Sequence, residues 1–252
     1  MSTNLDFPGL LRLIDERSAA FRAVVAAAPG LDLPVPSCPG WTLADLAQHI
    51  GTGRHRWAAT VAAGPADAPP DRALWNTSDA PTDRADLLAW LAEASERLRE
   101  ALLTAGPDAG CWAWWDPFQS PLTSGTVARH QLQEMTVHTY DAQLAVGAVE
   151  PLPVEVAIEG VDEFLTTCVA TTIPWPHDPA VVDYRTVEGP SWRVHLSADG
   201  ARIDRAPAAA GVTVLGTAGE LILLFYGRTG LDTLKVDGDG GIIDRLAAWE
   251  PE

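Results

Sequence analysis

The stretch that decides the fold is Arg129-His130-Gln131-Leu132-Gln133-Glu134-Met135-Thr136-Val137-His138-Thr139-Tyr140-Asp141-Ala142. Residues four apart lie on the same face of a helix, so Glu134 and His138 project side by side, about 6 Å apart along the axis. A carboxylate oxygen and an imidazole nitrogen at this spacing can converge on one divalent metal. The same face carries Val127, Val137 and Ala145, and a glutamate among apolar residues is costly unless it is paired or coordinated. We therefore predict a metal inside a helical bundle.

Length, hydrophobic content and net charge argue against two classes, membrane-spanning proteins and nucleic-acid-binding proteins. The chain has 252 residues, 47% of them hydrophobic, and no apolar run approaches the roughly 20 residues of a membrane span. The formal net charge is −17, which repels phosphate backbones and argues against a nucleic-acid partner. The N-terminal residues do not have the pattern of a secretory signal. We expect a monomer with no membrane partner.

The cysteines and the basic residues give hints about the setting. Three cysteines without C-x-x-C spacing argue against a disulfide framework and favour the reducing cytoplasm. Of the 17 basic residues only Lys235 is a lysine. This bias is typical of a high-GC genome, such as that of an actinobacterium.

Hydrophobic periodicity predicts four helices in the first part of the chain, near residues 6–28, from Thr42 onward, over 83–105 and over 124–146. Thr42 and Asp45 resemble a capping box. Four helices of similar length predict a bundle whose core can hold a metal. We expect this metal-binding domain to span residues 1–149.

Beyond Gly147 the pattern changes to mixed helix and strand. We expect a helix over 154–170, a half-buried strand over 191–197, and short strands near 201–205, 211–215 and 233–237. Thr217 and Glu220 form a capping box that opens an apolar helix, and a last helix covers 241–249. Residues 150–252 are therefore predicted to form an α+β domain.

A third metal ligand is needed, because catalytic zinc sites usually have three protein ligands and one open position. His49 is the best candidate, since a rotation of about 100° per residue places it at the edge of the apolar stripe of the second helix. His130 lies one turn before Glu134 and is either a supporting group or an alternative ligand. Asp141 follows His138 by one turn, where it can accept a hydrogen bond from an imidazole N–H and fix its tautomer.

Two other interpretations of these residues stay open. In the first, His49 and His138 are ordinary half-buried histidines and Glu134 pairs with an arginine, because E-x-x-x-H is common by chance in helices. In the second, the Cys38 thiolate is a metal ligand. The segment Cys38-Pro39-Gly40 is, however, better explained as a turn with a buried thiol.

Two further groups are candidates for substrate binding. Trp112, Trp114 and Trp115 crowd the connection before the fourth helix; aromatic clusters are usually core, but these could wall a substrate pocket. Arg228 ends an apolar helix, where it either complements the helix dipole or captures a substrate carboxylate with two parallel hydrogen bonds.

Several of these segments resemble the mycothiol-dependent maleylpyruvate isomerase family, part of the DinB-like superfamily of metal-dependent four-helix bundles. The matching segments of the N-terminal half are C-P-G-W-T at 38–42, Asp45-Leu46 with His49, and Glu134-x-x-x-His138-x-x-Asp141-Ala142. The resemblance continues over 162–165, 223–228 and 236–239, in a domain whose family fold is similar to sterol carrier proteins. One departure is Gln133, where family members often have histidine.

The resemblance implies that His49, Glu134 and His138 bind zinc or another divalent metal, and that Arg228 reaches the active site from the second domain. A thiol bound at such a metal is deprotonated. The implied function is a zinc-dependent enzyme that uses mycothiol as cosubstrate to isomerise, or transfer sulfur to, a small electrophile. The alternatives are a hydrolase with zinc-activated water, and a non-catalytic carrier or regulator with structural zinc.

Overall fold

The computed structural model describes residues 5–75, 77–205 and 211–249, which form two compact units. The first, here called the helical unit, comprises Leu5–Trp114 and Leu122–Leu152. The second, the sheet unit, comprises Trp115–Pro121 and the described residues from Pro153 onward.

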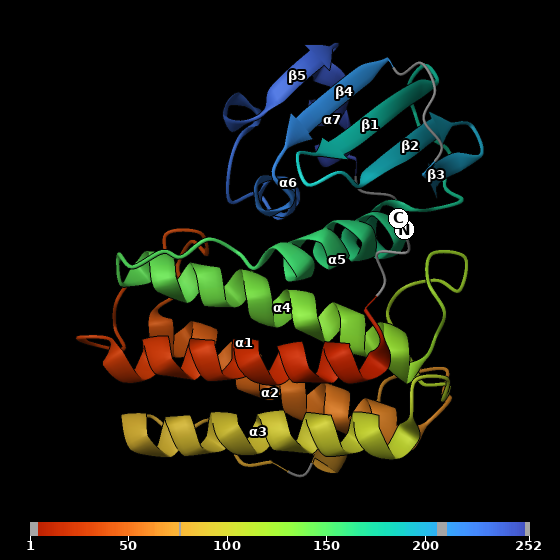
Figure 1. The fold of residues 1–252 in the computed structure, drawn as a ribbon. Coiled ribbons are helices and arrows are strands. Elements are labelled where there is room, and N and C mark those ends of the chain that lie inside the picture. The colour runs from red at the N-terminus through yellow and green to blue at the C-terminus, as the bar shows by residue number, and fades with distance from the viewer. Residues whose placement is uncertain (1–4, 76, 206–210, 250–252) are drawn as a thin grey trace. The chain divides into compact units, whose positions relative to one another are not determined.

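The helical unit contains the four predicted long helices: α1 (Phe7–Ala27), α2 (Leu43–Ala63), α3 (Arg84–Ala105) and α4 (Ser124–Ala145), with a short 3-10 turn η1 (Arg72–Trp75) between α2 and α3 (Figure 1). Helix α1 packs against α3 and α4, and α2 packs against the same two helices. The prediction of a four-helix bundle is confirmed. No helix of the described residues combines the length and apolarity that a membrane span needs.

The entry into α2 follows from local sequence chemistry. The Trp41 amide donates to the Cys38 carbonyl at 3.0 Å, which closes a tight turn, and Gly40 adopts φ 84°. A proline followed by a glycine with positive φ is typical of a type II turn. Directly afterwards, the Thr42 hydroxyl and the Asp45 carboxylate each accept from the other's backbone N–H, which confirms the capping box. The segment before α2 is thus held in one conformation.

The core of the helical unit requires a close contact between α2 and α3. Gly51 of α2 lies against the indole of Trp90, and a Cβ at Gly51 would meet Cζ3 of that ring at 1.9 Å. Around this contact the buried side chains of all four helices form one cluster, which includes Phe21, Val25, Leu43, Leu46, Leu87, Leu91 and Met135. The glycine therefore sets how closely these two helices approach.

The sheet unit holds a five-stranded sheet in the order β3-β2-β1-β4-β5. The strands are β1 (Ala180–Thr186), β2 (Ser191–Ser197), β3 (Gly200–Asp204), β4 (Val212–Gly216) and β5 (Lys235–Gly238). Among the described strands, β1 and β4 are the only pair that is parallel. The helices are α5 (Val154–Phe164), α6 (Ala218–Phe225) and α7 (Gly241–Ala247), with a short 3-10 turn η3 (Leu231–Thr233) (Figure 1).

The two faces of the sheet have different chemistry. On one face Val182 of β1 lies opposite Val194 of β2 and Val212 of β4, and all three are fully buried. On the other face Asp183 lies opposite Arg193, which donates to both carboxylate oxygens at 2.6 and 2.8 Å. The hydrogen bonds from Arg193 lower the pKa of Asp183. The central strand is therefore held by apolar packing on one side and an ion pair on the other.

Two elements differ from the sequence prediction. Strand β1, which is central to the sheet, was not predicted. The helix expected over 154–170 is α-helical only to Phe164 and then continues as a π-helical turn, η2 (Leu165–Val169), which ends where the Ala170 amide donates to the Leu165 carbonyl at 3.0 Å. A π-helical turn is rare and often lies at a functional site.

We predict that Gly51→Ala destabilises the helical unit by about 1–3 kcal/mol, because an added methyl in a packed contact forces neighbouring groups apart. Gly53→Ala in the same helix is the matched control. It has open space within 4 Å, so alanine should stabilise the helix by about 0.5–1 kcal/mol. Urea unfolding followed by circular dichroism measures both variants. Equal effects of the two substitutions would contradict the proposed role of the Gly51–Trp90 contact.

Candidate metal centre

Three polar residues of α4 lie on successive turns of one helix face. The Nε2 atoms of His130 and His138 lie 3.9 and 3.5 Å from the Glu134 carboxylate, one contacting each of its oxygens. The helix begins at Thr123, whose hydroxyl accepts from the Thr126 amide, as expected for an N-cap. This arrangement is the one that the spacing of the three residues predicts.

Helix α2 brings His49 to the same point. Its Nε2 lies 3.7 Å from Glu134 Oε2, and its ring centroid lies 5.1 Å from that of His138. One ligand atom from each of His49, Glu134 and His138 lies within 4.8 Å of the other two. The structure therefore brings together the three residues that the sequence selected as a metal set.

The separations of these atoms suit a metal ion. Zinc–nitrogen and zinc–oxygen bonds of about 2.0–2.2 Å place tetrahedral ligand atoms about 3.4 Å apart. The distances of 3.5 and 3.7 Å to the Glu134 oxygen are close to that value. Two neutral imidazoles and one carboxylate are also a common donor set for catalytic zinc.

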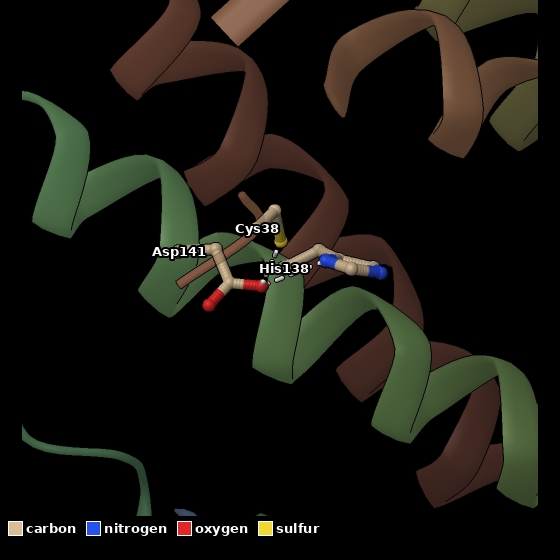
Figure 2. Close-up of side chains that lie close together, drawn as sticks. All are labelled: Cys38, His138 and Asp141. Carbon is tan, nitrogen blue, oxygen red and sulfur yellow. Dashed lines mark hydrogen bonds and ion pairs between the residues drawn. The ribbon is translucent and has the colours of Figure 1, made fainter. Parts of the chain in front are cut away.

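Asp141 orients the His138 ring. Its Oδ2 lies 2.8 Å from His138 Nδ1, and Figure 2 shows one His138 ring nitrogen and the Cys38 sulfur directed at this carboxylate, with the other ring nitrogen turned away from it. Because a carboxylate only accepts hydrogen bonds, Nδ1 is the donor to Asp141, and Nε2 is the ring atom that faces Glu134. A metal bound at Nε2 would require this orientation of the ring.

The segment before α2 supplies the other donors to Asp141. The Ser37 hydroxyl donates to Oδ1 at 2.6 Å, and the Cys38 thiol donates to Oδ2 at 3.6 Å. Asp141 has no exposed surface, so these donors compensate for its lost hydration. Cys38, His138 and Asp141 form a second group of possible metal ligands by distance alone. In this structure, however, the sulfur and the Nδ1 atom are both engaged by Asp141.

Electrostatics favours an ionised Glu134. Burial opposes ionisation, but the imidazoles of His49, His138 and His130 overcome it and lower the pKa of Glu134 to about 2. Its side chain is 32% exposed, so it faces an opening rather than the fully packed interior that the sequence suggested. An anionic oxygen among three imidazoles is suited to binding a cation.

A cavity of about 200 Å³ adjoins this group of side chains. His49, Glu134 and His130 line it together with Arg54, Arg56 and Trp114. Arg54 is 2% exposed, and neither of its terminal nitrogens has a hydrogen-bond partner within the described part of the chain. Burial lowers the pKa of Arg54 to about 10, so it stays cationic at neutral pH. The cavity thus has two arginines and one carboxylate in its wall, in a chain whose acidic residues are twice as numerous as its basic ones.

The three tryptophans before α4 have different surroundings. Trp114 is half exposed and lines the cavity, with its ring 5.6 Å from that of His130. Trp112 packs against Trp57, and the Arg56 guanidinium lies 5.4 Å from its ring centroid. Trp115 is buried, and it groups with the sheet unit. Of the three, Trp114 is the one that reaches the cavity.

Arg228 lies just after α6 in the sheet unit. Its guanidinium donates to the Tyr226 carbonyl at 2.6 Å, and its backbone amide donates to the Leu223 carbonyl. These contacts satisfy carbonyls at the end of the helix, as its structural interpretation predicts. A role at the metal centre stays a prediction.

Four residues of the site had no role in the sequence-based predictions, and Arg56 of the cavity wall is one of them. Trp41 was part of the C-P-G-W-T match but received no role, although its ring lies 5.0 Å from His49 and 6.5 Å from His138. Ser37 had no recognisable signal. Arg54 had one, because it follows Ile50 by four residues and precedes Trp57 by three, and so interrupts the apolar stripe of α2.

Comparison with known protein families identifies both parts of the chain. Residues 11–143 match the mycothiol maleylpyruvate isomerase N-terminal domain, and residues 155–245 match the MDMPI C-terminal domain. The chain belongs to the mycothiol maleylpyruvate isomerase family. Membership in this family indicates an enzyme. No curated protein matches the sequence.

Solved structures show the same fold at low sequence identity. A crystal structure of the mycothiol-dependent maleylpyruvate isomerase matches with a TM-score of 0.59, and that of a histidine-to-alanine mutant matches with 0.62. Each has 13% identity and covers 92% of this chain and 93% of the other. The fold predicted from the family resemblance is confirmed.

We predict that Arg54→Met raises the free energy of unfolding by about 1–3 kcal/mol, because it removes a buried cation whose two terminal nitrogens have no hydrogen-bond partner among the described residues, and keeps the apolar stem. Arg72→Met, in an exposed ion pair with Asp79, is the control and should change stability by less than about 0.5 kcal/mol. Urea unfolding measures both. A lower free energy of unfolding for Arg54→Met would show that the Arg54 nitrogens make hydrogen bonds in solution.

Proposed function

We propose that this chain is a zinc-dependent enzyme that uses mycothiol as cosubstrate to isomerise a small electrophile or to transfer sulfur to it. The observation that supports this most directly is the convergence of ligand atoms from His49, Glu134 and His138 within 4.8 Å, in a member of the mycothiol maleylpyruvate isomerase family. Another divalent metal of similar preference would use the same residues.

In this proposal each part of the site has a separate task. His49, Glu134 and His138 would hold the zinc ion, and a metal bound there would supply the positive charge that lowers the pKa of a thiol. Asp141 holds the His138 ring so that Nε2 faces Glu134. Ser37 and Cys38 donate hydrogen bonds that keep the Asp141 carboxylate in place. His130 supports the Glu134 carboxylate from the preceding turn.

The reaction itself needs a thiolate and a place for negative charge. A thiolate that adds to a conjugated double bond moves an electron pair onto the carbonyl oxygen and leaves a single bond that can rotate. Return of the pair expels the thiolate and gives the other geometric isomer, so no other reactant is consumed. If the thiolate stays attached after a proton is taken up, the result is sulfur transfer.

Arginine is the residue type suited to holding an anionic electrophile during these steps. Arg54 and Arg56 line the cavity beside Glu134, and we assign them to attracting the anion. We also propose that Arg228 orients a substrate carboxylate. Trp114 is assigned to the cavity wall, and Trp112 and Trp115 remain candidates for the substrate pocket.

A panel of small electrophiles, assayed with and without mycothiol, tests the proposal. We expect turnover of conjugated carboxylates that depends on both metal and mycothiol. Turnover of esters or amides without any thiol would favour the zinc-water hydrolase. Tight metal binding without turnover of any member would favour the carrier or regulator with structural zinc.

We also propose a cytoplasmic setting, consistent with the finding that Cys38, Cys111 and Cys168 form no disulfide.

His138→Ala should reduce bound zinc to a small fraction of the wild-type content, because two ligands seldom hold this metal tightly. His195→Ala is the control, since that exposed histidine pairs with Asp204 in the sheet unit. Metal analysis of both purified variants gives the result. Full zinc occupancy in His138→Ala would disprove the ligand assignment.

Asp141→Asn should weaken zinc affinity or activity by about 10–100-fold, because the amide cannot accept the His138 proton with the strength of a carboxylate. Asp79→Asn, at a position that is 91% exposed, serves as the control. Competition with a chromogenic chelator measures affinity. Unchanged affinity together with an unchanged rate would leave Asp141 with only a structural role.

Arg228→Lys should retain zinc and fold but lose most turnover on a carboxylate-bearing substrate, since an ammonium cannot reproduce the planar pair of donors. Arg245→Lys, from an exposed pair with Asp239, is the matched control. Steady-state kinetics and zinc content are measured for both. Near-normal turnover of Arg228→Lys would limit Arg228 to its contacts at the end of α6.

A further inference from the structure

A second cavity lies entirely within the sheet unit. Its volume is about 450 Å³, within the range of about 300–1,000 Å³ typical of small-molecule sites. The end of α5, the π-helical turn η2, strand β1, the segment from α6 to η3, and helix α7 enclose it. Its wall shares no residue with the cavity at His49 and Glu134.

The wall of this cavity is mostly apolar and aromatic. The apolar residues that line it include Phe164, Leu165, Leu224, Phe225, Leu231, Ile243 and Trp249. The Phe225 ring stacks on Phe164 at 5.0 Å and meets Tyr184 edge-on at 4.9 Å. The lining includes no arginine, lysine or histidine, and its one charged residue is Asp244. An anionic ligand would therefore meet a carboxylate and no cation.

One tyrosine brings a hydroxyl to this wall. Tyr184 is 2% exposed and lines the cavity. Burial raises the pKa of Tyr184, so the hydroxyl keeps its proton and can donate it. An acceptor on a bound molecule could take a hydrogen bond from this hydroxyl.

The backbone of the wall is also irregular at this place. Leu165, Cys168 and Val169 line the cavity and belong to the π-helical turn that follows α5. A π-helical turn widens the helix by one residue and is found mainly where function maintains it. The Cys168 thiol lies in the cavity wall, where its reactivity can report on occupancy.

We propose that this cavity binds a neutral, largely aromatic small molecule carrying one hydrogen-bond acceptor, which accepts from the Tyr184 hydroxyl. The apolar lining supplies affinity, the tyrosine fixes orientation, and Asp244 disfavours carboxylates such as fatty acids. The site is independent of the metal centre and needs neither the metal nor a thiol.

Two neutral fluorescent probes test the proposal with the full-length protein. Prodan is a naphthyl ketone with a carbonyl acceptor, whereas N-phenylnaphthylamine has no carbonyl. We expect both to bind with a blue shift of their emission. Tyr184→Phe should weaken Prodan about 3–10-fold, the effect of one neutral hydrogen bond, and leave N-phenylnaphthylamine unchanged. Tyr140→Phe, in the helical unit, is the control and should change neither.

A second variant and the labelling rate of Cys168 test whether the probes bind in this cavity. Val169→Trp should fill the cavity and weaken both probes at least about 10-fold. Bound Prodan should slow the reaction of Cys168 with N-ethylmaleimide, measured by peptide mass spectrometry with Cys38 and Cys111 as internal references. If Val169→Trp does not fold, Tyr184→Phe and the Cys168 rates decide alone.

Four results would overturn the proposal. The first is the absence of binding by both probes. The second is equal Prodan affinity in wild type and Tyr184→Phe. The third is a rate of Cys168 labelling that does not change when Prodan is bound. The fourth is displacement of Prodan by laurate at equal concentration, which would show that the cavity takes anions.

Discussion

The hydrogen bond between Asp141 and His138 is the interaction on which the arrangement of the helical unit's site depends. It sets the tautomer of a ring that faces Glu134, and the same carboxylate holds Ser37 and Cys38. Those two residues begin the tight turn that leads through Trp41 to the Thr42 cap of α2. One buried carboxylate therefore connects α4 to the start of the helix that carries His49. This connection explains why two motifs about a hundred residues apart in the chain belong to one site.

A second constraint is the charge balance around Glu134. The chain is strongly acidic, yet the cavity beside this carboxylate contains Arg54 and Arg56. A stability-driven sequence would place an apolar residue at position 54, since it lies in the apolar stripe of α2. A binding site, in contrast, benefits from a positive charge that is desolvated before the ligand arrives, because its attraction for an anion is stronger in a low-dielectric surrounding. Residues that break the local sequence pattern and lower stability are expected at functional sites.

Local chemistry explains which parts of the fold could be predicted. The helices, the caps at Thr42 and Thr217, and the approach of Glu134 to His138 depend on residues close in sequence, and the structure contains all of them. Strand β1 could not be predicted, because the ion pair of Asp183 with Arg193 and the parallel pairing with β4 exist only once the sheet has formed. The helical phase of the second helix predicted which face carries His49. Its distance from Glu134, however, depends on how α2 packs on α4.

The tryptophans show why residue type alone was insufficient for the substrate pocket. Trp112, Trp114 and Trp115 are nearly adjacent in sequence, yet one packs against Trp57, one lines the cavity, and one is buried in the other unit. In an irregular segment no periodicity relates neighbouring side chains, so each direction is set by a separate tertiary contact. Tyr184 illustrates the converse, because it lies two residues after Val182 in β1 and both are buried as core residues. Only the neighbouring cavity makes its hydroxyl a recognition group, and that cavity is a property of the folded sheet unit.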